Sequence, residues 1–362
     1  MKILYAIQGT GNGHLSRARD IIPALKKYCE VDILVSGHQS NVNLPYKINY
    51  RYRGLSFILG KKGGIDFWNT YVEAKLSNLR KEVKQVPVEK YDFVINDFEP
   101  VSAWACYKKK IPCISLSHQA AVLHPNAPKP KNQDLFGRYI LKNYAPSNIQ
   151  FGFHFDNYGQ DIFTPVIRQE IRNATIEDGE HYTVYLPSYG DEKLISILEK
   201  IKNVNWHIFS KQSNKKQKID NIEIIPIDND KYIESLRKCK GLLCNAGFEG
   251  PAEALYLGKK VMVIPQKSQY EQNCNAVAIK TLGVPVIKKL KQKNIHKLLD
   301  WIDSQQEIKI YYPDITDQIV KTILEQRVQK LLKENNWTEH NLKYETANSS
   351  KNQVLKNFPS KV

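Results

Sequence analysis

The chain has 362 residues, of which 42% are hydrophobic and 25% are charged, and its formal net charge is +16. This composition is typical of a globular protein with about two domains. No apolar run approaches the roughly 20 residues that a membrane-spanning helix needs. The charge favours an anionic partner, and because we find no nucleic-acid-binding motif we expect no nucleic acid.

The first expected strand, residues 2–7, leads into a turn that reads Gln-Gly-Thr-Gly-Asn-Gly-His-Leu-Ser-Arg over residues 8–17. Its glycines Gly9, Gly11 and Gly13 let the backbone take positive φ and approach a ligand closely. They do not follow the Gly-x-Gly-x-x-Gly spacing of dinucleotide-binding proteins, so a dehydrogenase is disfavoured. A strand that runs directly into such a turn is also unlike a signal peptide.

His14 is the sharpest candidate in this turn. It lies near the first residues of a helix, where the end of a parallel strand faces a crevice. The positive helix terminus disfavours the protonated imidazole, so we expect a neutral His14 that accepts a proton near neutral pH. The alternative is a histidine that caps or packs the turn. Arg17, one turn later, either meets a phosphate or faces solvent.

Residues 50–68 combine basic, aromatic and apolar side chains in the sequence YRYRGLSFILGKKGGIDFW. Such a segment can dip into a membrane surface while its Arg and Lys side chains contact anionic head groups. A strand followed by a basic loop explains the same composition. We favour the strand and loop, and a peripheral contact with an anionic membrane at its inner face remains the alternative.

Polar side chains follow the next two expected strands, residues 93–96 and 113–116. These side chains are Asp97, Glu99, His118 and Gln119. At the carboxyl end of a parallel sheet they reach the crevice, where an acid could orient His14 or act as a base itself. The alternative for Asp97 is that it caps the helix that Pro100 starts.

The alternation of short apolar strands with helical periodicity weakens over residues 156–179, and we place a domain boundary there. Further strands are expected at residues 31–35, 183–186, 207–209, 223–226, 242–244, 261–264 and 284–287. This alternation predicts two doubly wound α/β domains, residues 1–165 and 180–315. The six cysteines are scattered among apolar segments, which indicates reduced core thiols and a cytoplasmic protein.

Residues 244–276 are the most informative stretch of the second half and read CNAGFEGPAEALYLGKKVMVIPQKSQYEQNCNA. The pattern predicts a strand, a glycine turn, a helix, a second strand and a polar cluster that opens another helix. Backbone N–H groups at the start of the first helix form a ready site for a diphosphate. Glu253 lies one turn into that helix, on a face that reaches a ribose. Glu271, Gln272 and Asn275 follow a strand end, where ligands bind.

The last expected helix covers residues 316–333 and is long enough to cross back to the first domain. Residues 334–362 are rich in Asn, Lys and Ser and almost without apolar periodicity. This composition predicts a polar tail without a fixed structure.

The glycine turn resembles the Gly-x-Gly-His-x-x-Arg type of turn found in GT-B glycosyltransferases. Residues 244–276 are similar to the sugar-nucleotide region of the GT-B family that includes the N-acetylglucosaminyltransferase making lipid II. The resemblance covers most of the chain in domain order, although its motifs lie in these two stretches. It implies a GT-B architecture, in which two Rossmann-like domains face a cleft.

The resemblance also implies roles for single residues. The family's proposed base for the acceptor hydroxyl corresponds to His14, whereas Asp97 is a second catalytic candidate because of its position at a strand end. Donor-binding roles fall on Ser188, Gly247, Phe248 and Gly250 for the diphosphate, Glu253 for the ribose, and Glu271, Gln272 and Asn275 for the sugar. From their positions beside the crevice, and not from the resemblance, we expect the acceptor side to include Gly11, Gly13, Arg17, Glu99, His118 and Gln119.

Two acidic residues depart from the family's pattern. Glu249 lies inside the expected phosphate loop, where its carboxylate would repel a diphosphate unless it points away or pairs with a cation. Glu271 stands where the lipid II enzyme has a glutamine, so the sugar need not be N-acetylglucosamine.

We therefore expect an inverting glycosyltransferase that moves a sugar from a UDP-linked donor to a hydroxyl acceptor, which could be lipid-linked or a glycan. We expect no cofactor and no metal, because we identify no Asp-x-Asp motif placed after a strand as a metal-dependent sugar transferase requires. Two alternatives stay open. One is a UDP-sugar hydrolase or 2-epimerase on the same fold, and the other is a regulator that binds a nucleotide sugar without chemistry.

Overall fold

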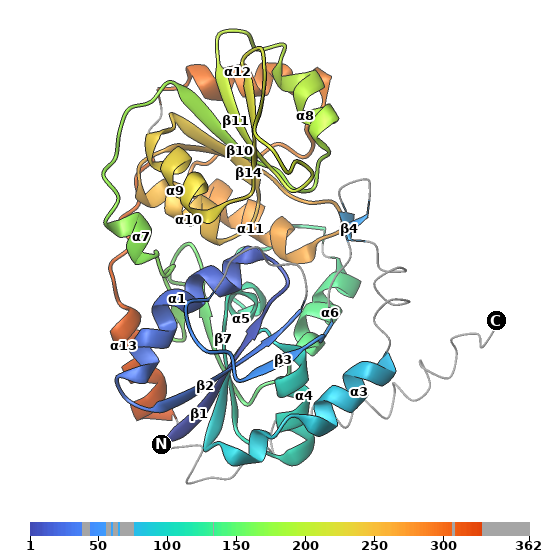
Figure 1. Cartoon of the computed structure of the whole chain (residues 1–362), viewed down its shortest axis with the longest axis vertical. Helices are drawn as coiled ribbons and strands as arrows, with labels where there is room; N and C mark the ends of the chain where they lie inside the picture. The colour runs from blue at the N-terminus through green and yellow to red at the C-terminus, as the bar shows by residue number, and fades with distance from the viewer. Residues whose placement is uncertain are drawn as a thin grey trace, which may run out of the picture.

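The computed structural model describes residues 1–37, 44–55, 59–60, 64–65, 76–132, 134–305 and 308–327. These residues form two α/β domains, and Figure 1 shows the first, in blue and green, below the second, in yellow and orange. Each domain is built around its own sheet of parallel strands. The predicted architecture of two Rossmann-like domains is therefore confirmed.

The sheet of the first domain has, within the described residues, seven parallel strands in the order β3-β2-β1-β6-β7-β8-β9. The strands are β1 (Lys2–Gln8), β2 (Glu30–Ser36), β3 (Tyr50–Tyr52), β6 (Phe93–Asp97), β7 (Cys113–Ser117), β8 (Ile149–Phe153) and β9 (Ile162–Phe163). Every residue of β6 and β7 is buried, because helices cover both faces of a parallel sheet.

The first domain's helices are α1 (Asn12–Lys26), α3 (Leu76–Gln85), α4 (Pro100–Lys109), α5 (His118–Leu123) and α6 (Leu135–Tyr144), with a 3-10 turn η1 (Val88–Lys90). A separate antiparallel pair, β4 (Leu59–Gly60) and β5 (Gly64–Ile65), lies outside the main sheet. Gly11 immediately precedes α1 with a φ of 92°, a conformation that only glycine adopts without strain. The glycine turn therefore lets the chain leave β1 and enter α1 at the sheet's carboxyl edge.

The second sheet has the order β12-β13-β11-β10-β14-β15, with β12 antiparallel and the other described strands parallel. Its strands are β10 (His181–Tyr185), β11 (Asn205–Ser210), β12 (Gln217–Ile219), β13 (Ile222–Pro226), β14 (Gly241–Asn245) and β15 (Lys260–Ile264). Its helices are α8 (Asp191–Leu198), α9 (Asn229–Lys238), α10 (Glu249–Tyr256), α11 (Tyr270–Thr281) and α12 (Ile295–Asp303), with a 3-10 turn η2 (Gln292–Asn294).

One expected strand is reduced to a single bridge. Residues 284–287 contribute an isolated parallel bridge between Val286 and Val263, beyond the edge strand β15. Pro285 has no N–H to donate, so the ladder cannot extend through it. Strands β3, β8, β9 and β12 were not expected, because β3, β9 and β12 have only two or three residues and Gly152 interrupts the apolar pattern of β8.

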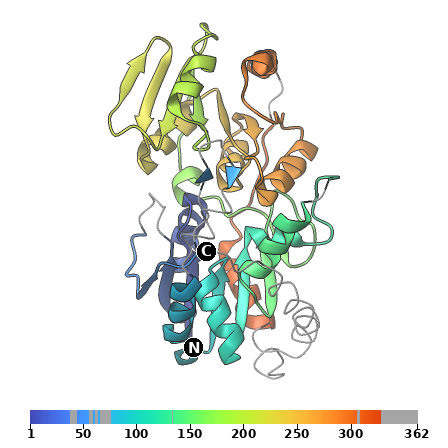
Figure 2. The same cartoon turned by 90° about the vertical axis from the view of Figure 1, so that its right-hand side faces the viewer.

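The chain passes between the domains twice. Residues 164–180 join β9 to β10 and include the short helix α7 (Gln169–Arg172). After α12 the chain returns, and α13 (Thr316–Thr322) packs against α1 of the first domain before a π-helical turn η3 (Ile323–Arg327). Figure 2 shows the two domains from the side, with α13 in red at the lower domain. The expected helix at residues 316–333 begins at Thr316, while residues 328–362, the expected tail included, lie outside the described residues.

Candidate active site

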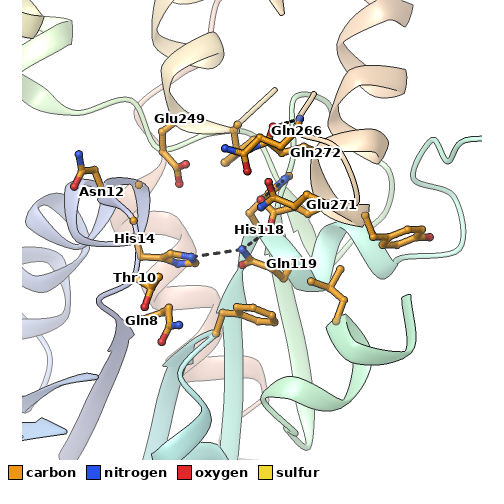
Figure 3. Close-up of a pocket in the computed structure, with 18 of the residues that line it drawn as sticks. Gln8, Thr10, Asn12, His14, His118, Gln119, Glu249, Gln266, Glu271 and Gln272 are labelled. Atoms are coloured by element: carbon orange, nitrogen blue, oxygen red, sulfur yellow. Dashed lines mark hydrogen bonds and ion pairs between the residues drawn. The ribbon is translucent and has the colours of Figure 1, made fainter. Parts of the chain in front are cut away.

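Two adjoining cavities lie between the domains, at the carboxyl ends of both sheets. The first, of 280 Å³, is lined by the glycine turn and α5 and α6 of the first domain and by the starts of α10 and α11 of the second. The second, of 220 Å³, lies mainly against the second domain, around Phe209, Ile227, Tyr232 and Glu253. Figure 3 shows residues of the first cavity converging from both domains. This crevice is where open α/β sheets bind their ligands.

The base of the first cavity holds a buried cluster of charges that joins α1 to the end of β6. His14 Nδ1 lies 2.8 Å from Asp97 Oδ1, and Arg17 Nη2 donates to Asp97 Oδ1 at 2.7 Å and Oδ2 at 2.8 Å. Asp97 is fully buried and Arg17 is 1% exposed. Because the carboxylate can only accept, we assign the imidazole proton to Nδ1. That tautomer leaves the lone pair of His14 Nε2 available to the cavity, which His14 lines.

The charges around His14 decide its protonation. Burial disfavours the imidazolium, but the charge and hydrogen bond of Asp97, with a smaller contribution from Glu249, outweigh burial and the opposing charge of Arg17. The pKa of His14 is therefore raised from its ordinary value of 6.5. The expectation that the helix terminus keeps His14 neutral was wrong in direction, because the neighbouring carboxylates dominate. For Asp97 burial opposes ionisation, yet Arg17 and His14 lower its pKa.

Asp97, the last residue of β6, and Glu99, two residues later, have different roles. Phe98 takes a φ of 56°, a rare conformation for a residue with a side chain, and its ring stacks near His14 with the centroids 6.4 Å apart. Glu99 caps α4: its carboxylate accepts from the backbone N–H groups of Val101 and Ser102 at 2.6 and 2.7 Å. Glu99 therefore carries the capping role that we had considered for Asp97, and it does not line either cavity.

Polar side chains bridge the cleft at the start of α5. His118 Nε2 lies 2.7 Å from Asn275 Oδ1 of α11, and its Nδ1 lies 2.7 Å from the carbonyl of Phe153. Gln119 Nε2 donates to Glu271 Oε2 at 3.0 Å and lies 3.5 Å from His14 Nε2, as Figure 3 shows. His118, Gln119 and Glu271 therefore line the first cavity together, whereas Asn275 is fully buried behind it.

The expected phosphate loop reaches the junction of the two cavities. Gly247 and Phe248 line both cavities, and Gly250 lines the second. The Phe248 ring is buried and stacks on His118, with the ring centroids 4.0 Å apart. Within the part of the chain that the structure describes, no side chain caps the N-terminus of α10. Its first backbone N–H groups are therefore free of the usual capping bond.

Glu253 is buried and already paired. Arg168, from the segment between the domains, donates through Nε to Glu253 Oε1 at 2.5 Å and through Nη2 to Oε2 at 2.8 Å. Arg168 also donates through Nη1 to Asn229 Oδ1 at 2.7 Å. A bidentate pair uses one acceptor position on each carboxylate oxygen, so a second position on each remains for a ligand hydroxyl.

Of the two other expected donor-binding residues, one lines the cavities and one does not. Gln272 lines both cavities and accepts from the backbone N–H of Gln266 at 2.9 Å. Ser188 donates to Asn245 Oδ1 at 3.0 Å and is not among the residues that line either cavity. Of the acceptor-side candidates, Gly11 and Gly13 line the first cavity, whereas Arg17 lies beneath it.

Sequence reasoning missed part of the site. The second cavity is lined by Arg168, Tyr185, Phe209, Ile227, Asn229 and Tyr232, none of which we had proposed. Ile227 follows the carboxyl end of β13, so the rule that ligands bind at strand ends could have found it. Arg168 lies between the domains in a stretch without periodicity, and no sequence signal connects it to Glu253.

The sequence does contain an Asp-x-Asp motif after a strand, which we overlooked. Asp228, Asn229 and Asp230 follow β13 after one intervening residue, Ile227. Asp228 caps α9, because its Oδ1 accepts from the Lys231 backbone N–H at 2.9 Å, and it also lines the second cavity. Among the described residues, no three His, Cys, Asp or Glu side chains form a group that could hold a metal ion.

Part of the segment proposed for membrane contact lies outside the described residues: of residues 50–68, the structure describes 50–55, 59–60 and 64–65. Tyr50–Tyr52 forms β3 at the edge of the first sheet, and Leu59–Gly60 pairs with Gly64–Ile65. In the described part of the chain we find no helix with the length and apolar character needed to cross a membrane.

Comparison with known proteins identifies the family. Residues 1–303 match the model of the family described as Glycosyl transferase family 1. A search of curated proteins finds no match. At 12% to 15% identity, the likeness to the solved structures that follow shows the fold alone.

The glycosyltransferase SnogD from Streptomyces nogalater has 12% identity and a TM-score of 0.51, with 92% of this chain and 99% of that chain covered. MurG from Acinetobacter baumannii has 15% identity and a TM-score of 0.50, with 92% and 99% covered. Arabidopsis thaliana UGT89C1 complexed with UDP has 14% identity and a TM-score of 0.56, with 92% and 99% covered. The chain therefore belongs to glycosyl transferase family 1 and is a glycosyltransferase of GT-B architecture.

Proposed function

We propose that this glycosyltransferase moves a sugar from a UDP-linked donor to a hydroxyl acceptor, with inversion at the anomeric carbon and without a metal. The observation that carries the proposal is the His14–Asp97 pair, which lies at the base of a cavity adjoining a second cavity that suits a nucleotide. A nucleoside in the second cavity and its sugar in the first would bring the anomeric carbon near His14.

His14 acts as the general base in this proposal. An acceptor hydroxyl in the first cavity gives its proton to Nε2 as its oxygen forms a bond to the anomeric carbon. Asp97, held 2.8 Å from Nδ1, fixes the tautomer and stabilises the imidazolium that forms. The bond between the anomeric carbon and the diphosphate breaks on the opposite face of the sugar, so the configuration inverts. UDP leaves with the bond's electron pair.

The start of α10 would stabilise the leaving diphosphate. Its uncapped backbone N–H groups and the positive end of the helix favour negative charge at the junction of the cavities. For the nucleotide, the support for UDP is the similar fold of UGT89C1, whose structure contains UDP. Phe209, Ile227 and Tyr232 give the second cavity an aromatic and apolar wall suited to a base.

The first cavity supports a hydroxyl acceptor with an apolar portion. Phe98, Ile140 and Leu141 line one part of it, while Gln8 and Gln119 supply polar groups. Apolar walls with a few placed polar groups are typical of small-molecule sites. Lipid-linked sugars and glycans with an apolar aglycone fit this description.

Replacing His14 tests the proposal. With a UDP-sugar panel and a mixed set of hydroxyl acceptors, the variant His14→Ala should lose about 10²–10⁴-fold in transfer rate, the usual contribution of a general base. Calorimetry should show UDP binding unchanged, because His14 does not face the nucleotide cavity. The control is His296→Ala, on the exposed face of α12.

Other outcomes point elsewhere. Full transfer activity in the His14→Ala variant contradicts the assignment of the base. Rapid turnover of the UDP-sugar without any acceptor identifies a hydrolase or an epimerase instead. Donor binding without turnover in either protein, whatever acceptor is offered, supports a regulator.

A further inference from the structure

A carboxylate stands where the two cavities meet. Glu249 is the first residue of α10, and it lines both cavities together with Gly13 and Gly247. In the proposed complex the sugar lies in one cavity and the nucleoside in the other. The diphosphate that joins them must therefore pass this junction, and Glu249 already occupies it.

Glu249 does not point away from the junction. Its carboxylate forms an ion pair with Arg17 Nη1 across the cleft, and Figure 3 shows it directed toward the glycine turn and His14. A Cβ atom added at Gly13 would overlap Glu249 Oε2. The space that the glycine turn leaves open for a close approach is thus taken by an anion of the protein itself.

Arg17 is a buried cation that does not use all of its hydrogen-bond donors. Its Nη2 is bound to both oxygens of Asp97, its Nη1 is held by Glu249, and its Nε has no partner among the described residues. Glu249 is 22% exposed at its side chain, whereas Arg17 is 1% exposed. The acid can therefore rotate toward solvent, while the arginine is held in place by Asp97.

We propose that Glu249 is an internal substitute for the donor's diphosphate. In the donor-free enzyme its carboxylate fills the diphosphate position and neutralises Arg17. An arriving donor displaces it, because two anions cannot share the site, and the diphosphate then pairs with Arg17 Nη1 and with the α10 backbone N–H groups. This inference rests on the proposed nucleotide-diphosphate donor.

The exchange connects donor binding to the base. Arg17 contacts Asp97, which in turn holds His14 at 2.8 Å, so a diphosphate on Arg17 is joined to the catalytic pair through one guanidinium. The exchange also makes recognition specific for the diphosphate. A nucleoside without phosphates carries no negative charge that could pair with Arg17, so it leaves Glu249 in place.

The test removes the charge of Glu249 and keeps its shape. Calorimetry of Glu249→Gln should show UDP binding about tenfold tighter than in the wild type, a change of about 1.4 kcal/mol. Inorganic pyrophosphate should also bind more tightly, whereas uridine, which lacks phosphate, should bind both proteins equally. The matched control is Glu180→Gln, which makes the same change in net charge at an exposed residue that lies just before β10, at the end of that strand away from the cleft, and pairs with Lys240. Thermal unfolding should confirm that Glu249→Gln folds, since the Arg17–Asp97 pair remains.

The outcomes separate this inference from the proposed function. If the wild type binds UDP and Glu249→Gln binds it equally or more weakly, the substitute role is overturned and the donor site stands. If the substitution Glu249→Gln strengthens the binding of uridine as much as that of UDP, Glu249 acts on the nucleoside pocket and the inference is also overturned. If neither protein binds a uridine, guanosine, cytidine or thymidine diphosphate, both the donor assignment and this inference fail.

Discussion

Arg17 determines the electrostatics of the site at the scale of single residues. It lies between two carboxylates, Asp97 and Glu249, with its guanidinium 4.9 Å from the ring centre of Phe153. Burial opposes the charge of Arg17, but the two carboxylates outweigh burial and its pKa is raised. A permanently charged Arg17 keeps Asp97 ionised, and an ionised Asp97 is what makes His14 basic.

The raised pKa of His14 predicts the pH dependence of transfer. The base must be neutral, so kcat/KM should increase with pH and level off above a midpoint that lies higher than 6.5. The Asp97→Asn variant removes the charge that raises this pKa, so its midpoint should shift to lower pH while the plateau rate falls about 10²-fold or more. A pH–rate profile measures both quantities.

A remote acid provides the control for this profile. Asp92 lies just before β6, at the opposite end of that strand, and accepts from the Lys2 backbone N–H. Asp92→Asn makes the same chemical change and should leave the midpoint where the wild type has it. An Asp97→Asn midpoint equal to that of the wild type would contradict the electrostatic role of Asp97.

Individual site residues were predictable to different degrees. His14 and Gly13 follow from the local turn sequence, which directly encodes a sharp turn at a strand end. The partner of Glu249 was not predictable, because Arg17 is 232 residues away and the pairing depends on how the domains face each other. The capping role went to Glu99 rather than Asp97, since the backbone turn at Phe98 places Glu99, not Asp97, at the start of α4.

At the scale of elements, α10 presents two acids to the cleft, which our proposals assign to different parts of the donor nucleotide. Glu249 begins the helix at the junction of the cavities, and Glu253 follows one turn later in the second cavity. Arg168 fixes the Glu253 carboxylate from outside the helix. The i, i+4 spacing places both acids on the same face of α10, facing the cleft.

A cycle of protein and ligand changes tests the ribose role of Glu253. Calorimetry should show that the wild type binds 2′-deoxy-UDP more weakly than UDP by about 1–1.5 kcal/mol, the net contribution of a hydrogen bond. In Glu253→Gln this difference should shrink toward zero, even though UDP itself also binds about 1–3 kcal/mol more weakly. Comparing this difference between the two proteins separates a ribose contact from a general loss of binding that follows when Arg168 loses its partner. If the difference is as large in the variant as in the wild type, Glu253 does not contact the 2′-hydroxyl.

The elements of the second domain were predictable where the local signals agree. The sequence around β14, α10 and β15 combines apolar β-branched strands with a glycine turn, and the structure has these elements where they were expected. The segment at residues 284–287 was misjudged because its apolar composition is that of a strand, while Pro285 prevents a continuous ladder. The contact between Arg168 and α10 depends on tertiary packing, which periodicity does not encode.

At the scale of the whole molecule, α13 packs the last described segment of the chain against the first domain. Ile319, Val320 and Ile323 are buried, and α13 packs along α1. Near the same contact Asp317 accepts from Lys27 at 3.1 Å and from Tyr28 at 2.8 Å. Apolar burial should dominate the stability of this contact, since exposed ion pairs contribute little.

Truncating one buried side chain of α13 should reveal its contribution. Ile319→Ala should lower the free energy of unfolding by about 2–4 kcal/mol through lost burial and the cavity left behind. The neighbouring Gln318 is exposed, so Gln318→Ala should change it by less than about 0.5 kcal/mol. Urea denaturation followed by tryptophan fluorescence measures both. Equal unfolding midpoints for the two variants would mean that α13 is not docked on α1.

The two passages of the chain between the domains are bonded to each other. Gln169 Nε2 donates to Asp314 Oδ2 at 2.5 Å, and Arg172 Nη1 donates to the carbonyl of Tyr312 at 2.8 Å. Figure 1 shows α7 and the segment that leads to α13 along the same edge of the molecule. A single covalent connection would allow the domains to rotate relative to each other about many axes. Two connections that lie side by side and are hydrogen-bonded to each other restrict this motion mainly to rotation about one axis. Any rotation of one domain against the other should therefore widen the gap between them most at the edge opposite these passages.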